Sequence, residues 1–163
     1  MATTAETNRR VRRLRADGEA KAEETARYLE GLTDEQARVM TEIGWTVAAT
    51  AAHLASVAGL GATQLKQLKR GKAPTVPNAV VNAINFVTSR MSRGKPIAGS
   101  AAKLRANTQT NLALLDDWTD AELGTAYKKP YYGATTYEEG LRYTLVGHLD
   151  EHMGQVRRAL SDS

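Results

Sequence analysis

The stretch from Tyr143 to Leu160, YTLVGHLDEHMGQVRRAL, carries the strongest pattern in the chain. It holds two of the three histidines in the sequence, His148 and His152, which are four residues apart. On a helix, residues with this spacing lie on one face, with Cβ atoms about 5–6 Å from each other. Two imidazoles placed in this way can bind one metal ion. The stretch therefore predicts a helix that carries two metal ligands.

The apolar residues of this helix recur on the same face as the histidines. Thr136 and Glu139 have the spacing of a capping box, which predicts where the helix begins. With about 100° of rotation per residue, six positions fall within about a third of the helix circumference. These positions are Leu141, Leu145, His148, Leu149, His152 and Val156. We therefore expect both histidines to face the core.

The third histidine lies in a second apolar stretch, WTVAATAAHLAS, which begins at Trp45. Thr46 is a good N-cap, and the helix that follows is expected to end near Gly59 or, with a kink there, near Arg70. A helix that is apolar nearly all round is buried in a larger core. His53 is therefore a titratable side chain among apolar ones, and the three histidines form one candidate constellation.

Burial of three imidazoles is costly unless each is hydrogen-bonded or bound to a metal. Neutral imidazole nitrogens suit zinc and nickel. Closed structural zinc sites usually have four ligands with cysteine among them, and this chain has no cysteine. We predict that His53, His148 and His152 bind a divalent metal, zinc or nickel, and leave a coordination position open. Core histidines without a metal are the alternative.

The segment between the paired histidines holds a candidate catalytic residue. His148 to His152 matches the H-x-x-E-H pattern of inverted zincin proteases, but no glutamate follows His152 to complete that site. We therefore reject the protease interpretation. Glu151 is our candidate general base or orienting partner of a histidine, and a solvent-facing charge is an equal alternative. Gln155, one turn further on, could touch the same site.

Helical periodicity also predicts helices over residues 6–30, 78–91 and 100–118, and the TDEQ capping box at residues 33–36 predicts a short helical turn. Pro74 and Pro77 predict a connection before residue 78. No segment is a convincing strand. The fold class we predict is all-α: one domain over residues 1–163, built as a four-helix bundle with one long connection.

Two shorter segments lead to more local predictions. Asp120 could cap the short turn that follows it. Residues 125–134 are expected to form a loop, whose tyrosines either pack the end of the bundle, which we favour, or line a pocket. These tyrosines are Tyr127, Tyr131 and Tyr132.

The net charge is only +4, but arginines crowd near the start of the chain, at positions 9, 10, 12, 13 and 15. Such a cluster could contact phosphates. No aromatic or base-reading motif accompanies it, so we favour a solvated helix face. The chain also has no apolar run long enough to span a bilayer and no signal-peptide core. With the lack of cysteine, this leads us to expect a cytoplasmic protein without a membrane partner.

In two motifs the chain resembles the DinB-like superfamily, which includes YfiT-like proteins and the N-terminal domain of mycothiol-dependent maleylpyruvate isomerase. The motifs are WTV at residues 45–47 with AHL at 52–54, and HLDEHMGQ at 148–155. The resemblance implies a four-helix bundle with zinc or nickel on His53, His148 and His152, and often a homodimer. Several members resemble transferases or isomerases that use mycothiol, bacillithiol or glutathione.

These observations lead to one main functional expectation. We expect a metal-dependent transferase that acts on a low-molecular-weight thiol and a small-molecule substrate, with metal-assisted hydrolysis as a close variant. A non-catalytic metal-binding module of the stress response is the first alternative. Nucleic-acid binding through the arginine-rich first helix is a weaker one.

Overall fold

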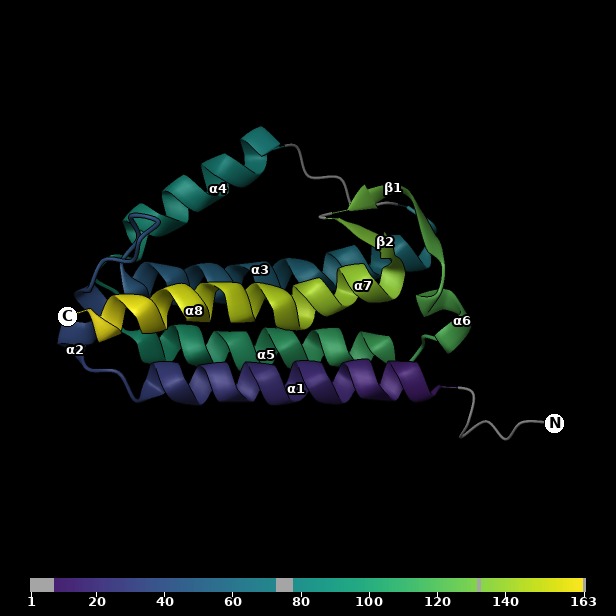
Figure 1. Ribbon diagram of the computed structural model, residues 1–163, viewed down its shortest axis with the longest axis horizontal. Helices are drawn as coiled ribbons and strands as arrows, with labels where there is room; N and C mark the ends of the chain where they lie inside the picture. The colour runs from purple at the N-terminus through teal and green to yellow at the C-terminus, as the bar shows by residue number, and fades with distance from the viewer. Residues whose placement is uncertain (1–7, 73–77, 132, 163) are drawn as a thin grey trace.

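The computed structural model describes residues 8–72, 78–131 and 133–162, and four of its long helices pack side by side as a bundle (Figure 1). These helices are α1 (Arg9–Glu30), α3 (Val47–Lys69), α5 (Ile97–Leu115) and α8 (His148–Ser161). Four other helices lie outside this set: α2 (Asp34–Arg38), α4 (Asn78–Met91), α6 (Asp120–Leu123) and α7 (Tyr137–Arg142). The predicted helical bundle is therefore confirmed. None of the described helices is both long enough and apolar enough to cross a membrane.

Local capping explains where several helices begin. Thr33 and Thr136 form the predicted capping boxes of α2 and α7, and the Thr46 hydroxyl accepts a hydrogen bond from the backbone of Ala49 at the start of α3. Such caps satisfy backbone N–H groups that have no partner inside the helix. The α3 helix continues through Gly59 without a break and ends at Lys69.

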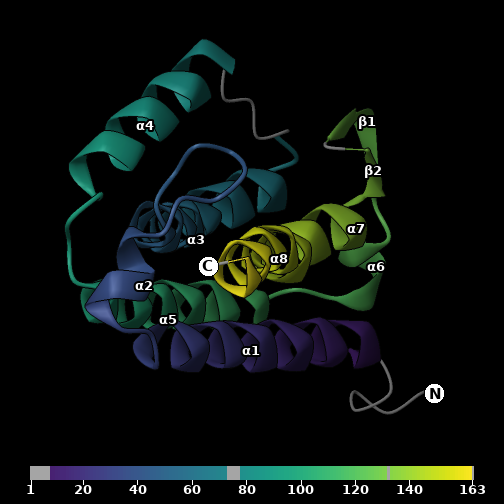
Figure 2. The ribbon, with the colours of Figure 1, turned by 60° about the vertical axis from the view of Figure 1, so that its left-hand side comes forward.

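The helix α4 lies on the long connection between α3 and α5 and stands apart from the bundle (Figure 2). This connection lets α3 and α5 run in the same direction, so that successive turns of one helix meet successive turns of the other (Figure 1). The stretch around Pro74 and Pro77, predicted to be part of this connection, lies outside the described residues.

The core fills the space between the long helices as two apolar clusters. One lies around Leu29, Leu54 and Leu104, and includes Met153 of α8. The other lies around Leu14, Leu65 and Leu112, toward the opposite end of the bundle. The apolar arc predicted for the last helix is buried as expected, apart from His148, which is half-buried.

The predicted loop at residues 125–134 is wrong, because the chain forms an antiparallel hairpin there. Its strands are β1 (Ala126–Tyr131) and β2 (Ala134–Thr136), and Gly133 between them has a φ of 76°. Tyrosine and threonine favour strands, but strands this short show little alternation in sequence. The Tyr127 ring packs against Tyr137 with centroids 5.0 Å apart, which favours packing for that tyrosine. Tyr132 and the side chain of Tyr131 are not described.

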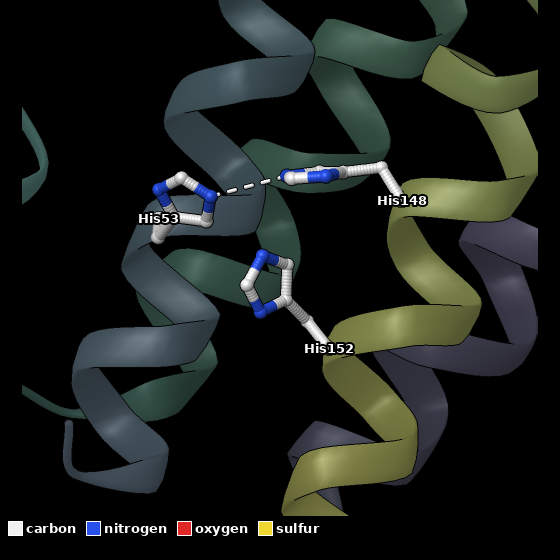
Figure 3. Close-up of side chains that lie close together, drawn as sticks. All are labelled: His53, His148 and His152. Carbon is white, nitrogen blue, oxygen red and sulfur yellow. Dashed lines mark hydrogen bonds between the residues drawn. The ribbon is translucent and has the colours of Figure 1, made fainter. Parts of the chain in front are cut away.

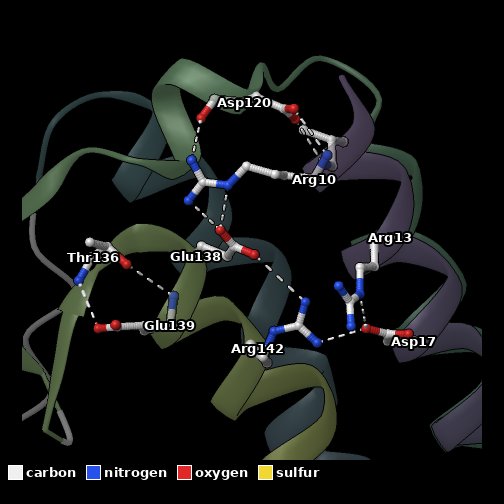
Figure 4. Close-up of polar contacts among 9 residues, drawn as sticks. Arg10, Arg13, Asp17, Asp120, Thr136, Glu138, Glu139 and Arg142 are labelled. Carbon is white, nitrogen blue, oxygen red and sulfur yellow. Dashed lines mark hydrogen bonds and ion pairs between the residues drawn. The ribbon is translucent and has the colours of Figure 1, made fainter. Parts of the chain in front are cut away.

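The predicted role of Asp120 is also corrected. Thr119 caps α6, through a capping box with Glu122. The Asp120 carboxylate instead accepts hydrogen bonds from the backbone N–H groups of Arg10 (3.0 Å) and Val11 (2.9 Å), at the start of α1 (Figure 4). A residue far away in sequence thus caps the first helix and places a negative charge at its positive end.

Several arginines of the N-terminal cluster form ion pairs. Arg10 pairs with Glu138 of α7, Arg13 with Asp17, and Arg15 with Asp116 (Figure 4 shows the first two pairs). Arg142 of α7 joins the same network by contacting both Asp17 and Glu138. The pairs Arg10–Glu138 and Arg142–Asp17 join α7 to α1. Together these ion pairs neutralise positive charge that a phosphate backbone would otherwise meet.

Candidate metal centre

The three predicted ligands come together between α3 and α8. His53 points from α3 toward His148 and His152, which project from successive turns of α8 (Figure 3). One ring nitrogen from each histidine lies within 4.8 Å of the others, and the ring centroids are 4.6–5.2 Å apart. The chain therefore holds a buried three-histidine group that could bind a metal ion.

A π-helical turn, η1 (Tyr143–Gly147), separates α7 from α8 and ends directly before His148. The sequence predicted a regular α-helix here, because a single wide turn barely disturbs the apolar pattern. A Cβ atom on Gly147 would lie 3.0 Å from the ring of Tyr143, so glycine lets this ring pack against the helix backbone. Single π-helical turns often occur at functional sites, and this one lies directly before the candidate ligand His148.

The spacing of two ring nitrogens matches a shared metal. The Nε2 atoms of His53 and His148 lie 3.1 Å apart. Two nitrogens bound to zinc at about 2.0–2.1 Å with tetrahedral angles would be roughly 3.3 Å apart. These two imidazoles are therefore already close to the spacing that a metal requires. Folding has ordered both rings, so metal binding would lose little further conformational entropy.

Burial keeps the site ready for a metal by keeping imidazoles neutral. Burial, with smaller contributions from His148 and His152, lowers the pKa of His53 from 6.5 to about 3. Burial and the neighbouring His152 lower the pKa of His148 from 6.5 to about 4. Both rings are thus unprotonated at neutral pH, and a metal would not have to displace a proton from a charged imidazolium.

Side-chain amides form hydrogen bonds with two of the rings. Nδ1 of His152 lies 2.8 Å from Oε1 of Gln155, an oxygen that can only accept, so Nδ1 carries the proton and Nε2 keeps a free lone pair. His53 forms a side-chain hydrogen bond with Asn85 of α4. Such partners orient metal-binding histidines and fix their tautomers. The sequence pointed to Gln155 but had no signal for Asn85, which lies on a different helix.

Aromatic rings form the walls of the site. Trp45 packs edge-on to His53, with centroids 5.0 Å apart, and is stacked on His152 at 6.1 Å. Tyr143 packs edge-on to His148 at 5.9 Å. In the sequence Trp45 stood out only as the start of the second apolar stretch and as part of the WTV motif, and Tyr143 carried no distinguishing pattern.

The candidate catalytic residue Glu151 is exposed at the edge of the histidine group. Its Oε2 accepts a hydrogen bond of 3.1 Å from the Tyr143 hydroxyl. Its charge acts on His148 by favouring the protonated form, against the larger effect of burial. Asp150 instead pairs with Lys21.

The donor set fits a divalent metal that prefers nitrogen. His53 is 5% exposed and His152 is 8% exposed, whereas His148 is half-buried and marks the more open side. Three imidazole ligands leave at least one coordination position for a water or a substrate atom, as in catalytic zinc sites. Fold and site together define a helical-bundle protein with a candidate three-histidine metal centre.

The sequence matches the family described as the DinB superfamily over residues 18–156, a range that includes all three histidines. The chain therefore belongs to the DinB superfamily. No curated protein and no solved structure matches it.

Proposed function

We propose that this protein is a metal-dependent transferase that acts on a low-molecular-weight thiol of the mycothiol, bacillithiol or glutathione type. The ligands of the metal, zinc or nickel, would be His53, His148 and His152. The observation that carries the proposal is that ring nitrogens of three imidazoles, two buried and one half-buried, lie within 4.8 Å of one another, and that two of these imidazoles have strongly lowered pKa values.

A divalent metal at this point would lower the pKa of a thiol that takes the open position, so that the sulfur reacts as a thiolate at neutral pH. The chain has no cysteine, so the reacting sulfur must belong to a substrate or a small cofactor. Gln155 and Asn85 orient His152 and His53, and Trp45 packs against both of these rings.

Glu151 is our candidate for the group that receives the thiol proton. It lies at the exposed edge of the site, where substrate must arrive, and Tyr143 holds its carboxylate beside His148. A general base in this position typically contributes about 10²–10⁴-fold to the rate.

One observation favours a second function, a metal-binding module without catalysis. The cavity that His148 lines within the bundle measures only about 10 Å³, which is close to the space of a single water molecule. This space is too small for a thiol substrate to lie beside His148 within the bundle.

Metal content tests the proposal. We would measure untagged protein by elemental mass spectrometry, together with His53→Ala, His148→Ala and His152→Ala variants. We expect about one zinc or nickel per chain and loss of the metal in each variant. Circular dichroism would show that the variants remain helical. Wild-type protein that binds no metal, and gains no thermal stability from added zinc or nickel, would overturn the metal centre.

Activity then separates the two functions. We would follow conjugation of each thiol with 1-chloro-2,4-dinitrobenzene by the metal-loaded protein. We expect Glu151→Gln to lower the rate while metal content is unchanged, and the neighbouring Asp150→Asn to have little effect. Full metal content without turnover of any of the three thiols would support the non-catalytic module.

A further inference from the structure

A second cavity, of about 480 Å³, is lined by residues of α3, α4 and α5. The helix α4 is the one that stands apart from the bundle (Figure 2). Its volume is in the range of small-molecule binding sites. It borders the histidine site through two helices. Ala52 and Ser56 line it from the same turns of α3 that carry His53, and α4 contributes both Asn85 to His53 and Val87 to the cavity wall.

One wall of this cavity is apolar and open to solvent. Val87 is 50% exposed and Met91 is 65% exposed, which makes them two of the few large apolar side chains that the described fold leaves uncovered. Ala52 and Ala55 of α3 continue the apolar lining. Covering apolar surface contributes about 25 cal/mol per Å², so a ligand with an apolar body would gain affinity from this wall.

The other wall is cationic. Lys95 and Lys103 line it, and no aspartate or glutamate is among its lining residues. Within the described part of the chain neither lysine forms an ion pair, although many other surface cations do, including Lys21, Lys69 and Arg105. Ser100, in the first turn of α5, adds a hydroxyl. The N-terminal end of α5, which carries a partial positive charge, thus also borders the cavity and adds to the positive charge of the two lysines.

We infer that this cavity binds a small organic anion with an apolar body, such as a medium-chain carboxylate. The carboxylate would lie against Lys95 and Lys103, and the chain would cover Val87 and Met91. The cavity lies beside the metal centre, and the second substrate of the reaction proposed above would be such an anion that also carries a leaving group on carbon: the thiolate sulfur forms the C–S bond as the leaving group departs with the electron pair of its bond to carbon. The role of the anion as second substrate rests on the proposed function. Binding of the anion to the cavity does not, because it requires no metal.

Octanoate is the probe, titrated by calorimetry into the full chain after metal has been removed with a chelator. 1-Octanol supplies the same chain without charge, and inorganic phosphate supplies charge without a chain. We expect octanoate to bind at least tenfold more tightly than either. Octanol that binds as tightly as octanoate, or octanoate that does not bind, would overturn the inference.

Two variants, each with a matched control, localise the site. A Cβ atom on Gly99 would meet nothing within 4 Å, so Gly99→Leu can fill the cavity without strain on the fold, and Gly94→Leu places the same side chain outside it. Lys95→Met combined with Lys103→Met removes the charge, and Lys66→Met is its exposed control on α3. We expect at least tenfold weaker octanoate binding in the two cavity variants and unchanged binding in the controls.

Unchanged binding in Gly99→Leu would place octanoate elsewhere and refute the cavity. The same titration on His53→Ala separates this inference from the metal centre. Binding of octanoate there, in protein that has lost its metal, supports the cavity whatever the outcome of the thiol assays. Loss of binding in that variant alone would contradict a site that is independent of the metal.

Discussion

At the scale of single residues, the histidine site depends on side chains that contact the imidazoles but would not contact the metal. Gln155 is buried, and its amide oxygen fixes the proton of His152 on Nδ1. A histidine without such a partner could rotate or bear its proton on the nitrogen that should bind the metal. The amide therefore determines how well the site binds, although it would not contact the metal itself.

Replacing Gln155 tests this role. We expect Gln155→Leu to weaken zinc binding by about 10–100-fold, because the acceptor for the Nδ1 proton of His152 is lost. Gln155→Glu keeps an acceptor at the same place and should bind zinc far more tightly than the leucine variant. Competition with a chromophoric chelator gives the affinities. Equal affinity in wild type and Gln155→Leu would show that the amide has no such role.

At the scale of elements, the contact between α3 and α5 depends on glycines. Asn107 and Asn111 of α5 donate side-chain hydrogen bonds to the backbone oxygens of Ala55 (2.8 Å) and Ala58 (2.9 Å) in α3. A Cβ atom on Gly61 would lie 2.5 Å from Nδ2 of Asn111. The asparagine amide can reach α3 only because this position has no side chain.

We therefore expect Gly61→Ala to lower the free energy of unfolding by about 1–3 kcal/mol, as overpacking of a core does. Gly99→Ala is the control, because its Cβ meets nothing within 4 Å, and it should stabilise the helix by about 0.5–1 kcal/mol. Urea denaturation gives both values. The cost of Gly61→Ala should shrink in an Asn111→Ala background, and a cost that persists there would place the clash elsewhere.

The start of α1 depends on a residue of another helix. We expect Asp120→Ala to destabilise the protein by about 0.5–2 kcal/mol, because the carboxylate caps the backbone of Arg10 and Val11. Asp117→Ala removes a nearby exposed carboxylate with no such contact and should change stability little. Hydrogen exchange should show faster opening of the first turn of α1 only in the Asp120 variant. Equal effects of both substitutions would contradict the cap.

At the scale of the whole molecule, the buried imidazoles make folding depend on pH. His53 and His148 have pKa values of about 3 and about 4 in the fold, and 6.5 when solvated. Above pH 6.5 neither state is protonated at these residues. Between pH 6.5 and about 4 the unfolded chain binds protons that the folded chain does not, so the free energy of unfolding falls as the pH falls.

We expect metal-free protein to lose stability from pH 6.5 to pH 5, with a slope that approaches about 1.4 kcal/mol per pH unit for each of these two histidines. Most carboxylates titrate at lower pH, so this window reports mainly on histidine. Urea denaturation at several pH values measures the slope. The double variant His53→Leu with His148→Leu should flatten it, and an equally steep slope in that variant would assign the effect to other groups.

Part of this structure could be predicted from the sequence because it depends on neighbours along the chain. The caps at Thr33, Thr46 and Thr136 act within one turn, and the apolar arc of the last helix repeats with the helical period. The hairpin at residues 126–136 and the turn η1 were missed. Short strands and a single wide turn leave almost no periodic signal.

The sequence by itself thus determined a bundle of amphipathic helices and a candidate set of three histidines, since both follow from local spacing and burial. Only the tertiary structure brought His53 to 3.1 Å from His148, placed Asn85 on His53, and capped α1 with Asp120. Each of these contacts joins segments far apart in the chain. Their geometry depends on how helices pack against one another, which no local pattern of residues encodes.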